Sequence, residues 1–101
     1  MSRFVLKLYI TGQTPRSERA VANLRRICER FHAEQYDLAI IDVLDRPQLA
    51  EDEKILATPT LIKESPPPTR RVIGDLSDTA QVMMMLDLPT SGASWPTKGA
   101  R

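Results

Sequence analysis

Two residues in the first third of the chain could carry nucleophilic or metal chemistry, Cys28 and His32, the only cysteine and the only histidine. A thiol reacts as its thiolate, which needs a charged partner or a helix N-terminus. Cys28 instead falls on the apolar stripe of an expected helix, where cysteine behaves as a small hydrophobic residue. His32 lies at the end of that helix without the companions that a zinc site requires. We therefore expect no catalytic thiol and no metal site.

A group of carboxylates is the second candidate, in this case for general acid–base catalysis. The group comprises Asp42, Asp45, Glu51, Asp52 and Glu53. Asp42 ends an apolar run, whereas the others surround a short expected helix, as is typical of a solvated face. No base or nucleophile accompanies them, and the chain has no glycine-rich loop that would hold a nucleotide. The sequence therefore predicts a protein that is not an enzyme and binds no cofactor.

The composition limits the remaining functions. At 101 residues the chain is long enough for one domain. Its net charge of +1, from 14 basic and 13 acidic residues, argues against a nucleic-acid partner. No run approaches the ~18 apolar residues needed to cross a membrane, and the N-terminus has no signal-peptide pattern. One cysteine cannot form an internal disulfide, so we expect a cytoplasmic protein.

The first half of the chain predicts two parallel strands joined by a helix. Residues 3–10 form an apolar, β-branched run that indicates a buried strand. Thr14 and Pro15 suit a helix N-cap and first turn, and apolar residues follow at helical spacing to about His32. Residues 37–43 predict a second buried strand. Two strands separated by one long helix indicate a right-handed βαβ unit.

The second half predicts a short helix, two antiparallel strands and a last helix. We expect the helix over 48–56 and strands over 60–63 and 70–73, joined through Pro66, Pro67 and Pro68. Ser77 is the expected N-cap of a helix to residue 88, in which three consecutive methionines cannot all face inward. The order βαβ–α–ββα is the thioredoxin-like α/β arrangement. We assign 1–88 to this domain and 89–101, with Trp95, to a flexible tail.

The turn at residues 57–60 resembles the proline turn that faces the active cysteines of thioredoxin-like proteins. Its Thr58 and Pro59 precede an apolar run, yet the segment that would supply the cysteines, residues 11–15, contains none. The sequence therefore predicts a thioredoxin-like frame without redox chemistry. Because X–Pro bonds isomerise slowly, Pro59 and the triple proline also make this region a candidate conformational switch.

Several collinear segments resemble the KaiB family, a component of the cyanobacterial circadian oscillator. The matching segments are residues 7–9 with Gly12, Thr14 and Pro15, then 41–44, 47–51, 54–61, 66–68 and 73–78. The resemblance runs from about Phe4 to Leu88, and its stretch over 42–60 is long and specific.

The resemblance implies partners and two folds. KaiB proteins bind the phosphorylated KaiC ATPase ring, sequester KaiA, promote KaiC dephosphorylation and displace the thioredoxin-like domain of the kinase SasA. The family is metamorphic: a homo-oligomer with a differently folded C-terminal half exchanges with a thioredoxin-like monomer. Two such folds coexist only when they differ by a few kcal/mol.

The resemblance also implies roles for individual residues. The KaiC-binding residues are Gln48, Leu49, Glu51, Asp52 and Lys54, and those of the KaiA-related function are Arg19 and Arg71. The fold-switch residues are Thr58, Pro59, Pro66, Pro67, Pro68, Met85 and Asp87. Met85 replaces a small residue of familiar members, and Lys98 and Arg101 make the usually acidic tail basic. These departures suggest a divergent or second-copy member.

Three alternatives to a KaiA-dependent oscillator component remain open. One is a regulator of KaiC in a timer or stress response without KaiA. Another is a free-standing SasA-like adaptor domain with a single fold. The third is a thioredoxin-type oxidoreductase, which the missing cysteine pair disfavours.

Overall fold

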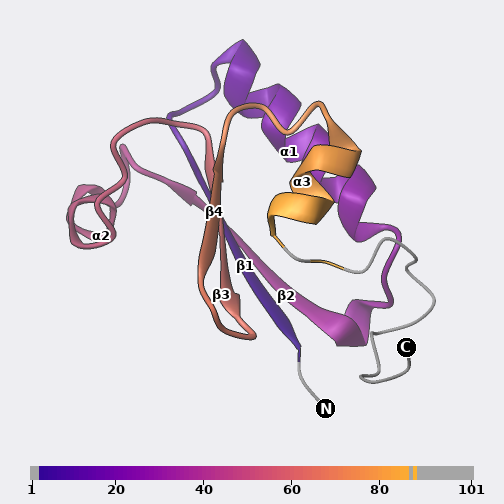
Figure 1. The fold of residues 1–101 in the computed structure, drawn as a ribbon. Helices are drawn as coiled ribbons and strands as arrows, with labels where there is room; N and C mark the ends of the chain where they lie inside the picture. Colours follow the sequence, from indigo (N-terminus) through magenta and orange to yellow (C-terminus); the bar gives the residue numbers. More distant parts are fainter. Residues whose placement is uncertain (1–2, 87, 89–101) are drawn as a thin grey trace.

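The protein forms a four-stranded sheet with helices packed mainly on one face (Figure 1). This is a computed structural model, and it describes residues 3–86 and Leu88. The elements in chain order are β1 (Phe4–Ile10), α1 (Pro15–Cys28), the 3-10 helix η1 (Ala33–Gln35), β2 (Tyr36–Asp42), α2 (Pro47–Asp52), β3 (Thr60–Ser65), β4 (Arg70–Ile73) and α3 (Thr79–Met85). The predicted order βαβ–α–ββα is confirmed.

The strand order in the sheet is β2-β1-β3-β4. β1 and β2 are parallel, in register from Phe4 opposite Tyr36 to Ile10 opposite Asp42, as the predicted βαβ unit requires. β3 runs antiparallel to β1, and β4 runs antiparallel to β3, which confirms the predicted hairpin through the prolines. β1 and β3 are therefore the inner strands, and β2 and β4 are the edges.

The core lies between the sheet and two helices, α1 and α3, which cover the same face (Figure 1). Alternate β1 residues, Phe4, Leu6 and Leu8, point into it and meet Leu24 of α1 and Leu86 after α3. α1 begins where predicted, because the Thr14 hydroxyl accepts the Ser17 N–H at 3.2 Å and Pro15 occupies the first turn.

Cys28 is buried at the end of α1, and burial raises the pKa of its thiol to about 11. The thiol is therefore protonated at neutral pH, in agreement with the structural interpretation of this residue. Of the three methionines in α3, Met83 is buried, whereas Met84 and Met85 are 73% and 44% exposed. They divide between core and surface, as the helical geometry predicted.

Two expectations for the first half were wrong. β2 is an edge strand and not a buried one, so Ile40 is 36% exposed. β2 has a neighbouring strand, β1, on one side only. The spacing of apolar residues along a segment does not distinguish such an edge strand from an inner one. α1 ends at Cys28, and the next residues form a turn in which the Phe31 N–H bonds the Cys28 carbonyl at 3.0 Å. His32 therefore caps η1 and does not end α1.

Two helices of the second half are shorter than predicted. α2 ends at Asp52, four residues before the expected end, because Lys54 takes a left-handed conformation that a helix cannot continue through. α3 begins at Thr79, and its N-cap is Asp78, whose carboxylate accepts the Gln81 N–H at 3.1 Å, and not Ser77. The predicted tail, residues 89–101, and Asp87 lie outside the described residues. Within the described part, no helix is long and apolar enough to span a membrane.

Candidate partner-binding surface

The residues expected to bind KaiC lie together on α2 and the turn that follows it. Gln48, Glu51, Asp52 and Lys54 are exposed, and Leu49 is half-buried. The Gln48 side-chain amide donates to the Asp52 carboxylate at 2.9 Å, one helical turn away. Shallow hollows lie on both sides of the helix, lined by apolar atoms of Pro47, Ala50, Ile55 and Leu56 on one side. We call this region, residues 47–56, the α2 surface.

The α2 surface combines carboxylates, a single ammonium and exposed apolar groups. Leu56 is 94% exposed, and nearby in sequence Leu44 is 66% exposed. A shallow surface with exposed apolar side chains offers area for a protein partner to bury, whereas small-molecule sites are enclosed clefts. Among the described residues, no group of histidine, cysteine and carboxylate side chains could hold a metal ion.

The C-terminus of α2 has the hydrogen bonds of a Schellman motif. The Ile55 N–H bonds the Ala50 carbonyl at 2.9 Å, and the Lys54 N–H bonds the Glu51 carbonyl at 3.1 Å. In this motif the residue after the cap is left-handed and is usually glycine. Here it is Lys54, with φ of 56°. A side chain held in a conformation that costs free energy is a recognised mark of functional sites.

Arg71, expected in the KaiA-related function, lies beside the α2 surface. From β4 its guanidinium donates to the Glu53 carbonyl at 2.5 Å and to the Lys54 carbonyl at 3.3 Å. The sheet pairs Arg71 with Ile62, and Ile62 with Lys7, so all three point to the face opposite α1 and α3.

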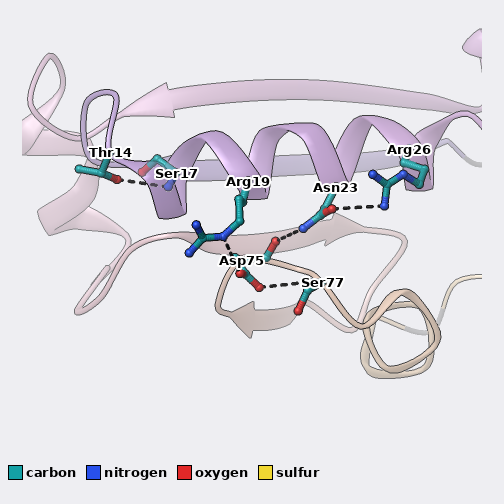
Figure 2. A network of polar contacts seen from close by, with 7 residues as sticks. All are labelled: Thr14, Ser17, Arg19, Asn23, Arg26, Asp75 and Ser77. Atoms are coloured by element: carbon teal, nitrogen blue, oxygen red, sulfur yellow. Dashed lines mark hydrogen bonds and ion pairs between the residues drawn. The ribbon is translucent and has the colours of Figure 1, made fainter.

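Arg19, the other residue of that expected pair, lies on α1 in a separate network (Figure 2). Its guanidinium meets the Asp75 carboxylate at 3.2 Å, and the Asn23 amide donates to the Asp75 main-chain carbonyl at 2.7 Å. The other Asp75 carboxylate oxygen accepts the Ser77 N–H at 3.2 Å. The network ties α1 to the loop between β4 and α3. The structure therefore does not bring Arg19 and Arg71 together.

Asp75 should make the stability of the protein depend on pH. The hydrogen bond from Arg19, and then that from Ser77, lower the pKa of its carboxyl. A lowered native pKa stabilises the fold above the unfolded pKa of about 3.9, and this contribution disappears as pH falls through the native pKa. We expect Asp75→Asn to lower the urea midpoint at pH 7, by an amount that shrinks as the pH falls below about 4. Asp45→Asn, an exposed control, should follow the wild type throughout, and a constant Asp75→Asn deficit would contradict this assignment.

The turn at Thr58 and Pro59 joins three parts of the chain. The Thr58 and Thr11 hydroxyl oxygens are 2.5 Å apart, and the Pro59 carbonyl accepts the Gly74 N–H at 2.9 Å. The Thr60 hydroxyl donates to the Ala57 carbonyl at 2.6 Å. The turn thus faces the segment that holds cysteines in thioredoxins, and hydroxyls meet there in place of thiols.

Two polar residues that were not predicted as sites stabilise the remaining loops. Lys63 is 1% exposed, and its ammonium donates to the Pro66 carbonyl at 3.1 Å, at the start of the triple proline. The Asp42 carboxylate accepts the N–H groups of Gly12 and Leu44 at 3.1 and 2.9 Å, which is a structural role and not acid–base chemistry. The Gly12 contact has no local sequence signal because it joins segments 30 residues apart, whereas the contacts of Asp42 with Leu44 and of Lys63 with Pro66 span two and three residues.

Comparison with known proteins matches most of the chain to one family. Residues 7–88 match the KaiB domain family. The chain is 54% identical over 92 residues to the circadian clock protein KaiB3 of Synechocystis, covering 91% of this chain and 90% of that one. It is 58% identical over 85 residues to the circadian clock oscillator protein KaiB of Prochlorococcus marinus, covering 84% and 81%.

Solved structures with the same fold include the N-terminal domain of SasA from Synechococcus elongatus. That domain is 27% identical, with a TM-score of 0.69 and 90% of both chains covered. Mitochondrial thioredoxin 3 of Saccharomyces cerevisiae has a TM-score of 0.69 at 16% identity, covering 87% of this chain and 81% of that one. The fold is therefore thioredoxin-like, as the sequence predicted.

Proposed function

Because the chain belongs to the KaiB family, we propose that it is a non-enzymatic clock component that binds the ring of a KaiC ATPase. The observation that supports this most directly is the α2 surface, where Lys54 stands exposed in a left-handed conformation. Such a position favours glycine, so the lysine side chain is kept there against the backbone preference.

We also propose that the complex sequesters KaiA, promotes KaiC dephosphorylation and competes with SasA. The shared fold of this chain and the SasA domain supports competition, since two domains of one architecture can occupy one surface in turn. Without a KaiA in the host, the same binding would regulate KaiC in a simpler timer. A single-fold adaptor like the SasA domain is the second candidate, supported by the same likeness.

We further propose that the C-terminal half has an alternative fold, in a dimer or tetramer that exchanges with the monomer in the cytoplasm. Support comes from how the start of this half is held: the Thr58 hydroxyl contacts that of Thr11 in the first half, and the Pro59 carbonyl accepts the Gly74 N–H. Its proposed switch residues are Thr58, Pro59, the prolines from Pro66 to Pro68, Met85 and Asp87.

The test of ring binding is direct. We expect the purified protein, mixed with KaiC homologues from its own host and ATP, to co-elute with a ring on size exclusion, while a thioredoxin of similar size elutes alone. Absence of a complex with every KaiC homologue, at micromolar concentrations and over hours of incubation, would show that the proposal is wrong.

A further inference from the structure

α2 has little in the fold to hold it in place. It stands apart from α1 and α3 (Figure 1), and none of its six residues is fully buried. A short helix with no buried face is unstable on its own. The orientation of the α2 surface must therefore depend on a few specific contacts.

Arg71 makes the most direct of these contacts. The Schellman hydrogen bonds satisfy the carbonyls of Ala50 and Glu51. Two further carbonyls follow the helix, those of Glu53 and Lys54, and the Arg71 guanidinium donates to both. A planar guanidinium can donate to two neighbouring acceptors at once, which an ammonium cannot do with the same geometry.

The two carbonyls that Arg71 contacts belong to the peptide units on either side of the Lys54 Cα. Holding both units restricts φ and ψ of that residue. A left-handed conformation is unfavourable for a residue with a side chain, so it persists where the surroundings impose it. Arg71 supplies this restraint from a strand that lies 17 residues later in the chain.

A second feature shows that the segment after α2 lies close to the same face of the sheet. The Tyr9 side chain is fully buried there, and its hydroxyl has no hydrogen-bond partner within the described residues. Burial is the main cause that raises the pKa of Tyr9, the charge of Glu53 raises it further, and that of Arg71 opposes the rise. Tyr9 lies two residues after Lys7 on β1, so its side chain points to the same face of the sheet as Arg71.

We propose that Arg71 is a positioning residue: it fixes the backbone on both sides of Lys54 and so sets the direction in which the α2 surface presents that ammonium to its partner. This inference rests on the proposed function and assigns to Arg71 a role through Lys54, in place of a direct contact with KaiA. Its effect on partner binding therefore passes through the α2 surface.

The experiment compares Arg71→Lys, which keeps the charge and loses the planar fork, with Arg70→Lys. Arg70 is the matched control because it is exposed on the same strand, and its side chain makes no hydrogen bond or ion pair with the rest of the described chain. We expect amide hydrogen exchange at Lys54 and Ile55 to be about tenfold faster in Arg71→Lys, since hydrogen bonds to a charged donor are lost. Exchange in Arg70→Lys should equal that of the wild type.

Binding to the KaiC ring, measured in the same variants, separates positioning from contact. Arg71→Lys should weaken it about tenfold in the wild-type background and less than about twofold when Lys54 is already glycine. Unchanged exchange, or an equal loss of affinity in both backgrounds, would overturn the proposal. If the wild type binds no ring, both the proposed function and the role of Arg71 in binding are wrong. Faster amide exchange in Arg71→Lys would in that case still establish that Arg71 restrains the end of α2.

Discussion

A Lys54→Gly variant should be more stable than the wild-type protein and yet bind a KaiC ring at least about 30-fold more weakly. Glycine adopts the left-handed conformation of residue 54 without a steric penalty, which should raise the free energy of unfolding by about 0.5–1 kcal/mol after its greater freedom in the unfolded chain is counted. The loss of affinity follows from removing the exposed ammonium of the α2 surface.

Denaturant titration and a ring-binding isotherm measure the two effects separately. Lys54→Ala is the matched control, because it removes the same side chain but keeps a Cβ in the left-handed conformation. It should lose affinity like Lys54→Gly without the gain in stability. Lys54→Glu, which reverses the charge, should bind most weakly of the three. Wild-type affinity in Lys54→Gly would remove Lys54 from the proposed interface.

Leu86→Ala should destabilise the described fold by about 2–5 kcal/mol. The Leu86 side chain is fully buried after α3, in the core that α1, α3 and the sheet share. A loss of this size is a large fraction of the stability of a small domain. If the C-terminal half has an alternative fold within a few kcal/mol, the same loss should shift the population towards it.

NMR spectroscopy and light scattering on Leu86→Ala distinguish the two outcomes. A second set of folded peaks together with a larger particle would indicate the alternative oligomer. Peaks of an unfolded chain alone would argue against a second fold of comparable free energy. Met84→Ala is the control on the same helix, because Met84 is 73% exposed and its truncation leaves no cavity. Its spectrum should match that of the wild type.

The elements that could be predicted from the sequence are those whose signals are local. Thr14, Pro15 and the apolar stripe of α1 specify a helix start and a buried face within one segment. β4 has the predicted bounds, Arg70–Ile73, because the triple proline and Gly74 limit it on both sides. The early end of α2 had no such signal, since no glycine marks the left-handed residue that ends it.

The parts of the candidate site that could not be predicted depend on distant segments. The family resemblance gave Arg19 and Arg71 a KaiA-related role without indicating their surroundings: Arg19 contacts Asp75, 56 residues away, and Arg71 contacts Glu53 and Lys54. Side chains on the two faces of a sheet cannot be assigned to neighbours until the strand order is known. β2 shows the same limit, because its apolar run is compatible with an inner or an edge strand.

The central place of β1 has a consequence for how the protein is made. β1 leaves the ribosome before both of its neighbours, and its parallel neighbour β2 is complete at Asp42. Its other neighbour, β3, is complete only at Ser65. Because synthesis proceeds at ~5–20 residues per second, one edge of this apolar strand stays unpaired for seconds on each nascent chain. During that interval, a chaperone or a slow step of translation over residues 43–65 would determine how much of the protein reaches its folded form.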